Sequence, residues 1–430
     1  MRCFFLLMSV LLVSAPACSG EVKPVKWQKD LRELERQLIE RHVDPFHSVS
    51  REEFEAAVND LDARIPTLTQ PEILVGIARI VAMVGDGHTS FYPGNQKKKW
   101  FHFYPVTLWS FSDGIYVIAA PPAHTDLYGK RLVRIDDTPI EEAWRRIRTT
   151  IGADNAMEYE YTVPFLLIRP EMLHVLGIAA SADRAEFHFE GGVRKTFRPL
   201  TVKEYQSLDW RTANGLYDGQ APPSARLDFL FASPLVLEHL QQRKYYWFTW
   251  LDEPRTLFFQ YNVCWDQKDR PSFAEVVDEL FRAMAERPVE RLVIDLRQNT
   301  GGEPRIAEPL IEGLARRSEF TSEGRLFVLV GRRTFSAALT NAAQLRAQAG
   351  ARIVGEAPRG KPNSPSEGRD IDLKRTKTWL TVSTQFVERD PALGDAEFLP
   401  VEIEATPSFD QFRQAQDPVL EAALAADLFR

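Results

Sequence analysis

Cysteine is scarce in this chain, and several motifs of metal and nucleotide chemistry are absent. Only three cysteines occur in 430 residues, Cys3, Cys18 and Cys264, and none of them has metal or redox spacing. The His-Glu-x-x-His helix, the phosphate-binding P-loop and the Gly-x-Ser-x-Gly turn are also missing. Asp86 and His88 are metal-ligand types, but no third ligand accompanies them. We therefore expect no metal and no cofactor, and a Cys18–Cys264 disulfide is left open.

The chain also lacks a long basic run, a low-complexity tract and an internal repeat. Its net charge of −7 makes nucleic acid and anionic membrane surfaces poor partners. After the N-terminus, no apolar run is long enough to span a bilayer. The apolar fraction of 44% and the length are typical of a globular protein with two or three domains. The composition leaves the oligomeric state open.

The N-terminus has the order of parts that is typical of a secretion signal. Arg2 precedes an apolar run over residues 3–13, and small residues follow at Ala15 and Ala17. We therefore predict that residues 1–17 are a signal peptide and that the protein is exported to the bacterial periplasm or cell surface. Cys18 follows the cleavage site, as in bacterial lipoproteins, although Ala15 stands where that signal favours leucine. A lipid anchor at Cys18 is thus one alternative.

The strongest positive feature is a serine between an apolar run and a helical pattern. Residues 326–330 are all apolar and predict a buried strand, and residues 336–349 predict a helix. A serine at a strand-to-helix turn has its hydroxyl beside unpaired N–H groups at the positive end of the helix. This arrangement suits a nucleophile whose attack creates an oxyanion. Helix capping is the alternative role for Ser336.

Two further segments strengthen the nucleophile interpretation. A continuous apolar strand ends at Asp295 and continues into a turn with Gly301 and Gly302, where glycines let N–H groups approach a ligand. The alternative for this segment is a plain strand-to-helix turn. His88 lies between glycines in residues 85–89, just after a helical pattern, and histidine is the side chain best suited to act as a base near neutral pH. A structural histidine is the alternative.

Together these segments resemble the tail-specific, or C-terminal processing, peptidase superfamily. This superfamily includes the core of the tricorn protease and the interphotoreceptor retinoid-binding protein. The matching motifs occur in the family's order, and they cover residues 85–89, 295–302, 334–338, 353–363 and 417–421. The resemblance extends over most of the chain and is weakest over residues 200–244.

The resemblance implies a serine peptidase site. Ser336 is then the nucleophile, and backbone N–H groups of Ala337 and of Gly301 or Gly302 bind the oxyanion. The resemblance implies no cofactor, and it implies a protein or peptide as the substrate.

Two residues are candidates for the base that activates the serine. In the tricorn-like branch a histidine from the N-terminal region has this role, which corresponds to His88. In the Ser-Lys branch a lysine on the segment after the nucleophile helix has it, which corresponds to Lys361. We favour His88, because the Gly-Asp-Gly-His motif has no evident purpose in a Ser-Lys enzyme. For the orienting acid we rank Glu367 first and Asp395 second.

The predicted fold class is α/β with several domains. We expect a helical region over residues 18–98, a β-rich module that resembles PDZ domains over 99–200, a helical connector over 201–244, and a catalytic β/α domain with a helix-covered sheet over 245–430. The PDZ-like module has no clear carboxylate-binding loop, so peptide capture and a purely structural insert both stay open.

Two functions from different classes follow. The first is an exported serine endopeptidase that forms an acyl-enzyme at Ser336. The second is a binder of apolar ligands or peptides without catalysis on the same fold, as the retinoid-binding relatives imply. The presence of both Ser336 and His88 favours the enzyme, because a binder needs no base.

Overall fold

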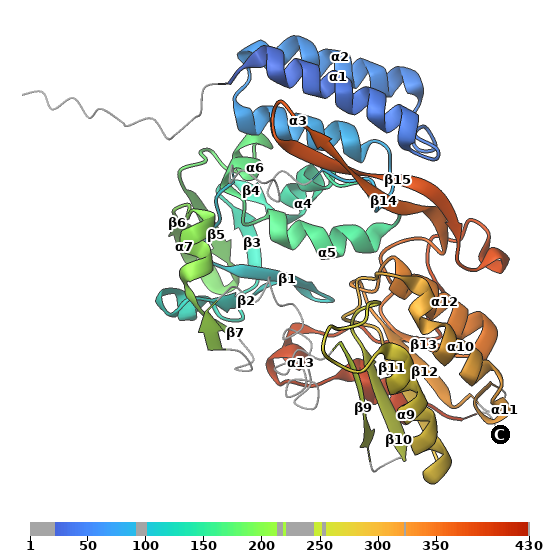
Figure 1. Ribbon diagram of the computed structural model, residues 1–430. Helices are drawn as coiled ribbons and strands as arrows, with labels where there is room; N and C mark the ends of the chain where they lie inside the picture. Colours follow the sequence, from blue (N-terminus) through green and yellow to red (C-terminus); the bar gives the residue numbers. More distant parts are fainter. Residues whose placement is uncertain are drawn as a thin grey trace, which may run out of the picture.

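The computed structural model describes residues 22–91, 101–212, 218–220, 245–251, 255–321 and 324–428. The predicted signal peptide and Cys18 lie outside these residues, as do residues 221–244 of the expected connector. Helices gather at one end of the molecule and a helix-covered sheet lies at the other, with a β-rich region beside them (Figure 1). This arrangement agrees with the predicted α/β class.

The helical region forms as expected. Its helices are α1 (Pro24–Arg41), α2 (Arg51–Arg64), the short η1 (Ile65–Thr67) and α3 (Gln70–Ala82). Ser50 caps α2 through a capping box with Glu53, which satisfies N–H groups that the first turn leaves unpaired. The apolar residues that recur along each helix are buried in one shared core, among them Leu34, Val58 and Ile77.

The PDZ-like region contains two four-stranded sheets, and it extends beyond residue 200 into the start of the expected connector. The first has the order β1-β2-β7-β8, and the second has the order β4-β3-β5-β6. The strands are β1 (Thr107–Phe111), β2 (Gly114–Ala120), β3 (Leu132–Ile135), β4 (Thr138–Pro139), β5 (Ala185–Phe189), β6 (Arg194–Phe197), β7 (Asp209–Thr212) and β8 (Asp218–Gln220). The helices of this region are η3 (Pro122–Leu127), α4 (Ile140–Arg148), α5 (Ala156–Leu166), α6 (Pro170–Val175), η4 (Glu190–Gly192) and α7 (Val202–Ser207).

The start of the expected helical connector differs from the prediction. Only α7 is helical there, and β7 then pairs with β2. Trp210 in β7 is fully buried, and its indole N–H donates to the carbonyl of Tyr205 at 3.3 Å. Burial of this large side chain against the neighbouring sheet outweighs the helical tendency of the local sequence.

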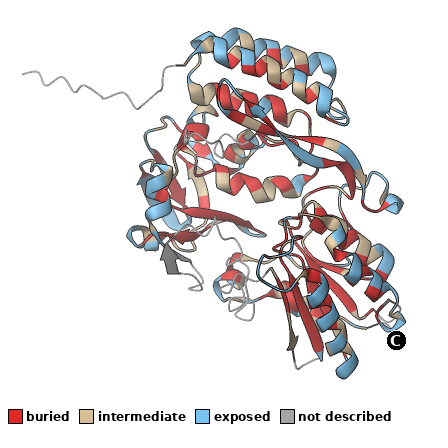
Figure 2. Ribbon diagram, viewed as in Figure 1, coloured by how far each residue is buried: buried red, intermediate tan, exposed pale blue. Residues whose placement is uncertain are grey.

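The C-terminal half contains a six-stranded sheet in the order β16-β13-β12-β11-β10-β9. All neighbouring pairs are parallel except β9 with β10, the hairpin that the sequence predicts. The strands are β9 (Tyr246–Leu251), β10 (Thr256–Tyr261), β11 (Arg291–Asp295), β12 (Leu326–Val330), β13 (Arg352–Gly355) and β16 (Ile403–Glu404). Buried residues dominate the four central strands, β10 to β13 (Figure 2).

Helices cover both faces of this sheet. One core joins the sheet to α9 (Phe273–Glu286), α10 (Glu308–Ala315) and α12 (Ala337–Ala349), and a second joins it to α14 (Pro418–Ala425). Shorter helices are η7 (Pro304–Ala307), α11 (Ser318–Thr321), η8 (Pro391–Leu393) and α13 (Phe409–Arg413). In parallel sheets of this kind, functional groups lie beyond the carboxyl ends of the strands. Gly301 and Ser336 both follow such ends, after β11 and β12.

A two-stranded ribbon leaves this half and packs against the N-terminal helices, which the sequence did not predict. It consists of β14 (Asn363–Leu373) and β15 (Thr378–Glu388), and it lies beside α1 and α3 in Figure 1. Leu373 and Leu380 of the ribbon are buried in the same core as the helices. At the ribbon's tip, Asp30 of α1 accepts from the Thr376 N–H at 2.7 Å. The ribbon thereby brings the C-terminal half into contact with the His88 loop.

No helix in the described part of the chain combines the length and the hydropathy that a membrane crossing requires.

Candidate active site

Ser336 lies at the turn between β12 and α12, and its backbone is strained. Its φ is 52° and its ψ is −124°, a conformation that side chains other than glycine rarely adopt. Ala337 begins α12, so the Ser336 side chain stands beside the N–H groups that the helix leaves unpaired. Ser336 is half-buried, and its side chain does not cap the helix. The capping alternative therefore has no support in the structure.

Hydrogen bonds to the preceding turn hold the nucleophile loop in place. The Thr334 hydroxyl donates to the Leu296 carbonyl at 3.0 Å and accepts from the Gly331 N–H at 3.1 Å. The Phe335 N–H donates to the Asn299 carbonyl at 3.2 Å. The loop after β12 is thus tied to the loop after β11, on which the two glycines lie.

The Gly301–Gly302 turn lies directly against Ser336. A side chain at Gly301 would place its Cβ 2.8 Å from Ser336 Cβ, so only glycine fits there. The Gly301 N–H already donates to Asn299 Oδ1 at 2.9 Å. By contrast, the N–H groups of Gly302 and Ala337 have no acceptor among the described residues. These two N–H groups are therefore the ones available to an oxyanion.

The loop of residues 85–89 is organised by the buried carboxylate of Asp86. Asp86 Oδ1 accepts from the N–H groups of His88 and Thr89 and from the Ser383 hydroxyl, at 2.9, 2.7 and 2.6 Å. His42 Nε2 lies 2.8 Å from Asp86 Oδ2. Burial alone would raise the pKa of Asp86, but the hydrogen bonds from His42 and Ser383 outweigh it and lower that pKa. Asp86 thus has a structural role, and it joins α1, the loop and β15.

The imidazole of His88 stacks on the ring of Phe335, the residue before the proposed nucleophile. The ring centroids are 4.3 Å apart and the planes are inclined by 21°. Both ring nitrogens of His88 are buried, and neither forms a hydrogen bond in the structure. His88 therefore contacts Phe335, the residue next to Ser336. No hydrogen bond joins His88 to Ser336 among the described residues.

The surroundings of His88 favour its neutral form. Burial lowers the pKa of His88 to about 3, and the Arg389 and Arg359 guanidinium groups act in the same direction against the opposing effect of Asp86. The Arg359 guanidinium lies 4.4 Å from the centroid of the Phe335 ring. The imidazole is therefore neutral, the form that a base requires, but a pKa this low makes it a weak proton acceptor in the state described.

Asp154 is a second buried carboxylate at this site, and the sequence analysis missed it. A side chain at Gly87 would place its Cβ 3.1 Å from Asp154 Oδ2, and one at Gly360 would place it 3.5 Å away. Asp154 Oδ2 is buried without a hydrogen-bond partner. Burial raises the pKa of Asp154 to about 7, with a further contribution from the Asp86 carboxylate. No local motif marks this residue, because its surroundings come from three distant segments.

The neighbouring Asn155 ties these segments together. Its side-chain amide donates to the carbonyls of Pro358, Gly360 and Glu397 at 3.1, 3.1 and 3.2 Å. The loop that carries Lys361 is thereby fixed to the start of α5.

The remaining candidates from the sequence differ in their proximity to His88. Glu367 is exposed in β14, and its φ of 55° is again unusual for a residue other than glycine. The next residue, Gly368, would place a Cβ 3.8 Å from His88 Cβ. Lys361 is half-buried, and its carbonyl accepts from the Arg389 guanidinium at 3.2 Å. Asp395 is exposed between β15 and β16, and its carboxylate contacts none of the other candidates.

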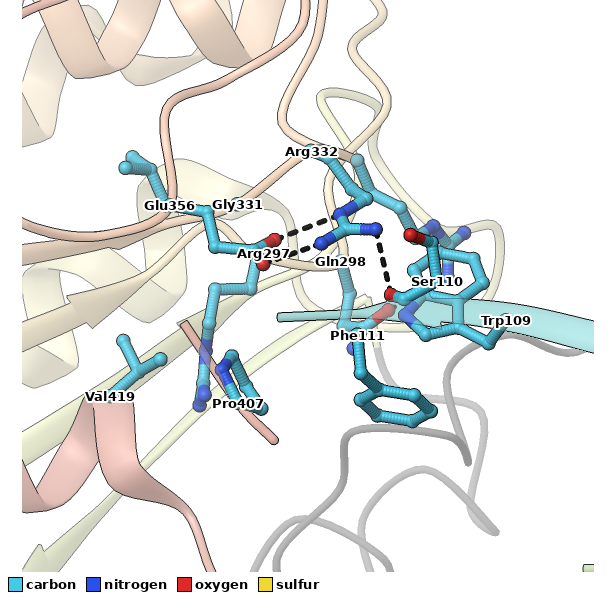
Figure 3. A pocket seen from close by; sticks show the side chains of 12 residues that line it. Trp109, Ser110, Phe111, Arg297, Gln298, Gly331, Arg332, Glu356, Pro407 and Val419 are labelled. Carbon is cyan, nitrogen blue, oxygen red and sulfur yellow. Dashed lines mark hydrogen bonds and ion pairs between the residues drawn. The ribbon is translucent and has the colours of Figure 1, made fainter. Parts of the chain in front are cut away.

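A small cavity lies where the PDZ-like region meets the loops after β11 and β12 (Figure 3). Arg332 of the nucleophile loop forms a two-point ion pair with Glu356, at 2.6 and 2.9 Å. The same guanidinium donates to the Ser110 carbonyl of β1 at 2.9 Å. These contacts give the PDZ-like region a direct structural connection to the loop that carries Ser336.

No protein-family model matches the chain, and no curated protein matches its sequence. Solved structures do resemble its fold. Mature CPAF complexed with lactacystin is 11% identical, with a TM-score of 0.58 over 93% of this chain and 97% of that chain. A further structure of mature CPAF is 12% identical, with a TM-score of 0.57 over 92% and 95% of the two chains. The photosystem II D1 C-terminal processing protease is 14% identical, with a TM-score of 0.38 over 93% of this chain and 100% of that chain.

The likeness to CPAF extends over nearly the whole of both chains. At 11–12% identity it shows a common fold. The multi-domain α/β fold expected from the resemblance to the tail-specific peptidases is therefore confirmed.

The burial of Asp154 predicts a stability that depends on pH. The pKa of an aspartate is about 3.9 in an unfolded chain, whereas that of Asp154 is raised to about 7 in the fold. Between these values the folded protein retains a proton that the unfolded chain has lost, so this group lowers the stability as the pH rises from about 4 to 7. The free energy of unfolding in urea is therefore the quantity to measure. As the pH rises from 4 to 8, that of Asp154→Asn should increase relative to the wild type by up to about 4 kcal/mol.

The exposed Asp395, replaced in Asp395→Asn, controls for the general effect of losing an aspartate. A difference between Asp154→Asn and wild type that stays constant from pH 4 to pH 8 would contradict the buried, protonated carboxyl.

The glycine turn predicts a second effect, on turnover. A Cβ at Gly302 would lie 2.5 Å from the Cys264 carbonyl oxygen, so Gly302→Ala must shift the turn and with it the N–H group of residue 302. Loss of one oxyanion donor typically reduces kcat by about 100- to 1,000-fold. Gly191→Ala is the matched control, because Gly191 also has a positive φ of 77° but open space around it. Equal casein hydrolysis by the two variants, both folded by circular dichroism, would exclude Gly302 from the oxyanion site.

Proposed function

We propose that this chain is an exported serine endopeptidase that cleaves unstructured protein or peptide substrates through an acyl-enzyme at Ser336. The observation that carries the proposal is the strained Ser336 backbone beside two unpaired N–H groups, those of Gly302 and Ala337. Strain of this kind costs about 1–3 kcal/mol and persists only where the surroundings hold it.

In the proposed mechanism His88 takes the proton from the Ser336 hydroxyl as its oxygen attacks the scissile carbonyl. The oxyanion of the tetrahedral intermediate accepts hydrogen bonds from Gly302 and Ala337. The proton then passes from His88 to the leaving amine, which departs and leaves an ester on Ser336. A water molecule, deprotonated by His88, hydrolyses the ester and frees the carboxylic acid product.

This mechanism requires a change at His88 from the state described here. The imidazole must leave its stack on Phe335 and turn one nitrogen toward Ser336. Its two buried and unpartnered nitrogens support such a change, because the new hydrogen bond replaces none. Asp86 accepts from the His88 N–H at 2.9 Å and so holds the backbone from which the imidazole would turn.

Glu367 is our first choice for the orienting acid. It adjoins Gly368, which lies against His88 Cβ, and its positive φ is a second strained position beside the site. Its negative charge also acts on Arg389, one of the two cations that lower the pKa of His88. Asp395 is the second choice, and no contact in the structure favours it.

Lys361 is retained as the alternative base, and ligand binding without catalysis is retained as the alternative function. The Lys361 carbonyl accepts from the Arg389 guanidinium, which holds the lysine's backbone in place. The strained serine favours the enzyme over the binder. We also propose the periplasm or cell surface as the location, with or without lipid on Cys18.

Active-site labelling and three variants test this function. The wild type should react with a fluorophosphonate probe at Ser336, as mapped by mass spectrometry, and should hydrolyse casein. Ser336→Ala and His88→Ala should be almost equally inactive, because members of one catalytic unit are not additive. Lys361→Ala should keep much of its activity. Because mature CPAF has been solved with lactacystin, that compound serves as a second probe.

The opposite ranking, an active His88→Ala beside an inactive Lys361→Ala, would replace the histidine mechanism with a Ser-Lys dyad. A folded wild type that neither labels nor hydrolyses casein would favour the binder instead.

Export is tested separately at the N-terminus. The order of Arg2, an apolar run and small residues predicts removal of residues 1–17. Mass spectrometry of the protein recovered from the exporting cell's periplasm or surface should therefore begin at or near Cys18, with or without lipid. Exported protein that still begins at Met1 would show that the segment is not cleaved.

A further inference from the structure

An exposed tryptophan lies beside the glycine turn of the active site. Trp265 is 56% exposed, and it is one of four large hydrophobic side chains that the described residues leave exposed. A side chain at Gly302 would place its Cβ 2.6 Å from Trp265 Nε1. The indole therefore covers the turn whose N–H group we assign to the oxyanion. An indole in water at this place leaves a large apolar surface uncovered.

The backbone on both sides of Trp265 is firmly held. Cys264 is fully buried, and it exchanges backbone hydrogen bonds with Gly301 and Glu303, at 3.1 and 2.9 Å. On the other side, Asp266 accepts from the Tyr246 hydroxyl at 3.0 Å and from the Phe273 N–H at 2.7 Å. The exposure of Trp265 is therefore a property of its place in the fold, in contrast to an aromatic residue on a frayed terminus.

The indole is close enough to Ser336 to contact a bound substrate. Gly301 lies against Ser336, Gly302 is the next residue, and Trp265 contacts Gly302. Because consecutive Cα atoms are about 3.8 Å apart, these contacts keep Trp265 Nε1 within roughly 12 Å of Ser336 Cβ. An extended peptide covers that distance in about three residues.

We propose that Trp265 forms the wall of a subsite that takes an apolar side chain within about three residues of the scissile bond. This proposal rests on the proposed peptidase function, and it assigns the substrate class as unstructured segments that carry an apolar residue near the cleaved bond. Contact with such a side chain removes apolar surface of both partners from water. A glycine or a charged residue at that position buries no apolar side chain against the indole, so its binding is not strengthened.

Peptide kinetics test the subsite. A casein digest mapped by mass spectrometry should show apolar residues enriched near the cleaved bonds. One cleaved sequence is then made as two peptides, with either the apolar residue or glycine at the enriched position. Trp265→Ala should lower kcat/KM for the apolar peptide at least tenfold, mainly by raising KM. Its effect on kcat/KM for the glycine peptide should be much smaller. Trp265→Phe, which keeps an aromatic face, should retain most of the preference.

Val25→Ala is the matched control, since it removes an exposed apolar side chain from α1 at the other end of the molecule. If the ratio of kcat/KM for the two peptides is the same in Trp265→Ala as in the wild type, the proposed subsite is wrong. An equal fall in kcat for both peptides would also overturn it, since this would mean that the indole only supports the Gly302 turn.

A binding experiment separates the subsite from the peptidase function. Ser336→Ala and the double variant Ser336→Ala/Trp265→Ala are titrated with the fluorescently labelled apolar peptide, and anisotropy is measured. The double variant should bind at least tenfold more weakly. If this difference appears but the wild type neither labels nor hydrolyses, the proposed function fails and the subsite stands as a binding site. If the wild type is an active peptidase and the two variants bind alike, the subsite fails and the function stands.

Discussion

The site depends on one constraint, which is that Ser336 must be held at a φ of 52° between a buried strand and a helix. Left-handed strain at a residue with a side chain costs about 1–3 kcal/mol, so other contacts must offset it. Thr334 and Asn299 do so by joining the loop after β12 to the loop after β11. Asn299 also binds the Gly301 N–H, whereas the next N–H, that of Gly302, has no acceptor among the described residues. The geometry of the proposed nucleophile and that of the proposed oxyanion donors therefore depend on the same residue, Asn299.

The other half of the site comes from the N-terminal region, and the β14–β15 ribbon brings the two halves together. The Ser383 hydroxyl on β15 donates to Asp86, and Gly368 on β14 packs against His88. The ribbon's apolar residues belong to the core of the N-terminal helices, so the stability of that core also positions the base. This explains why the packing of the N-terminal helices matters to a serine in the C-terminal half of the chain.

The sequence predicted those parts of the molecule whose signals are local. The alternation of apolar runs and helical patterns located β11, β12 and α12, and glycine punctuation located the turn at residues 301 and 302. It missed Asp154, Trp265 and the packing of the ribbon, because each depends on contacts between segments that are far apart in the chain. The local sequence does not distinguish Asp154 from an ordinary loop aspartate, because the residues that surround it, Gly87 and Gly360, are distant in the chain. The β7 strand was missed for the same reason, because its partner β2 is about ninety residues earlier.

Phe335 links the two halves of the proposed site. It is held by the same loop that strains Ser336, and its ring covers the imidazole that the proposed mechanism needs. A buried imidazole without hydrogen bonds is costly, and the same burial that lowers its pKa also keeps it neutral. The stack on Phe335 offsets only part of that cost. The hydrogen bond to Ser336 in the proposed mechanism would satisfy one of these nitrogens, and this gain in free energy would favour departure of the imidazole from its stack on Phe335.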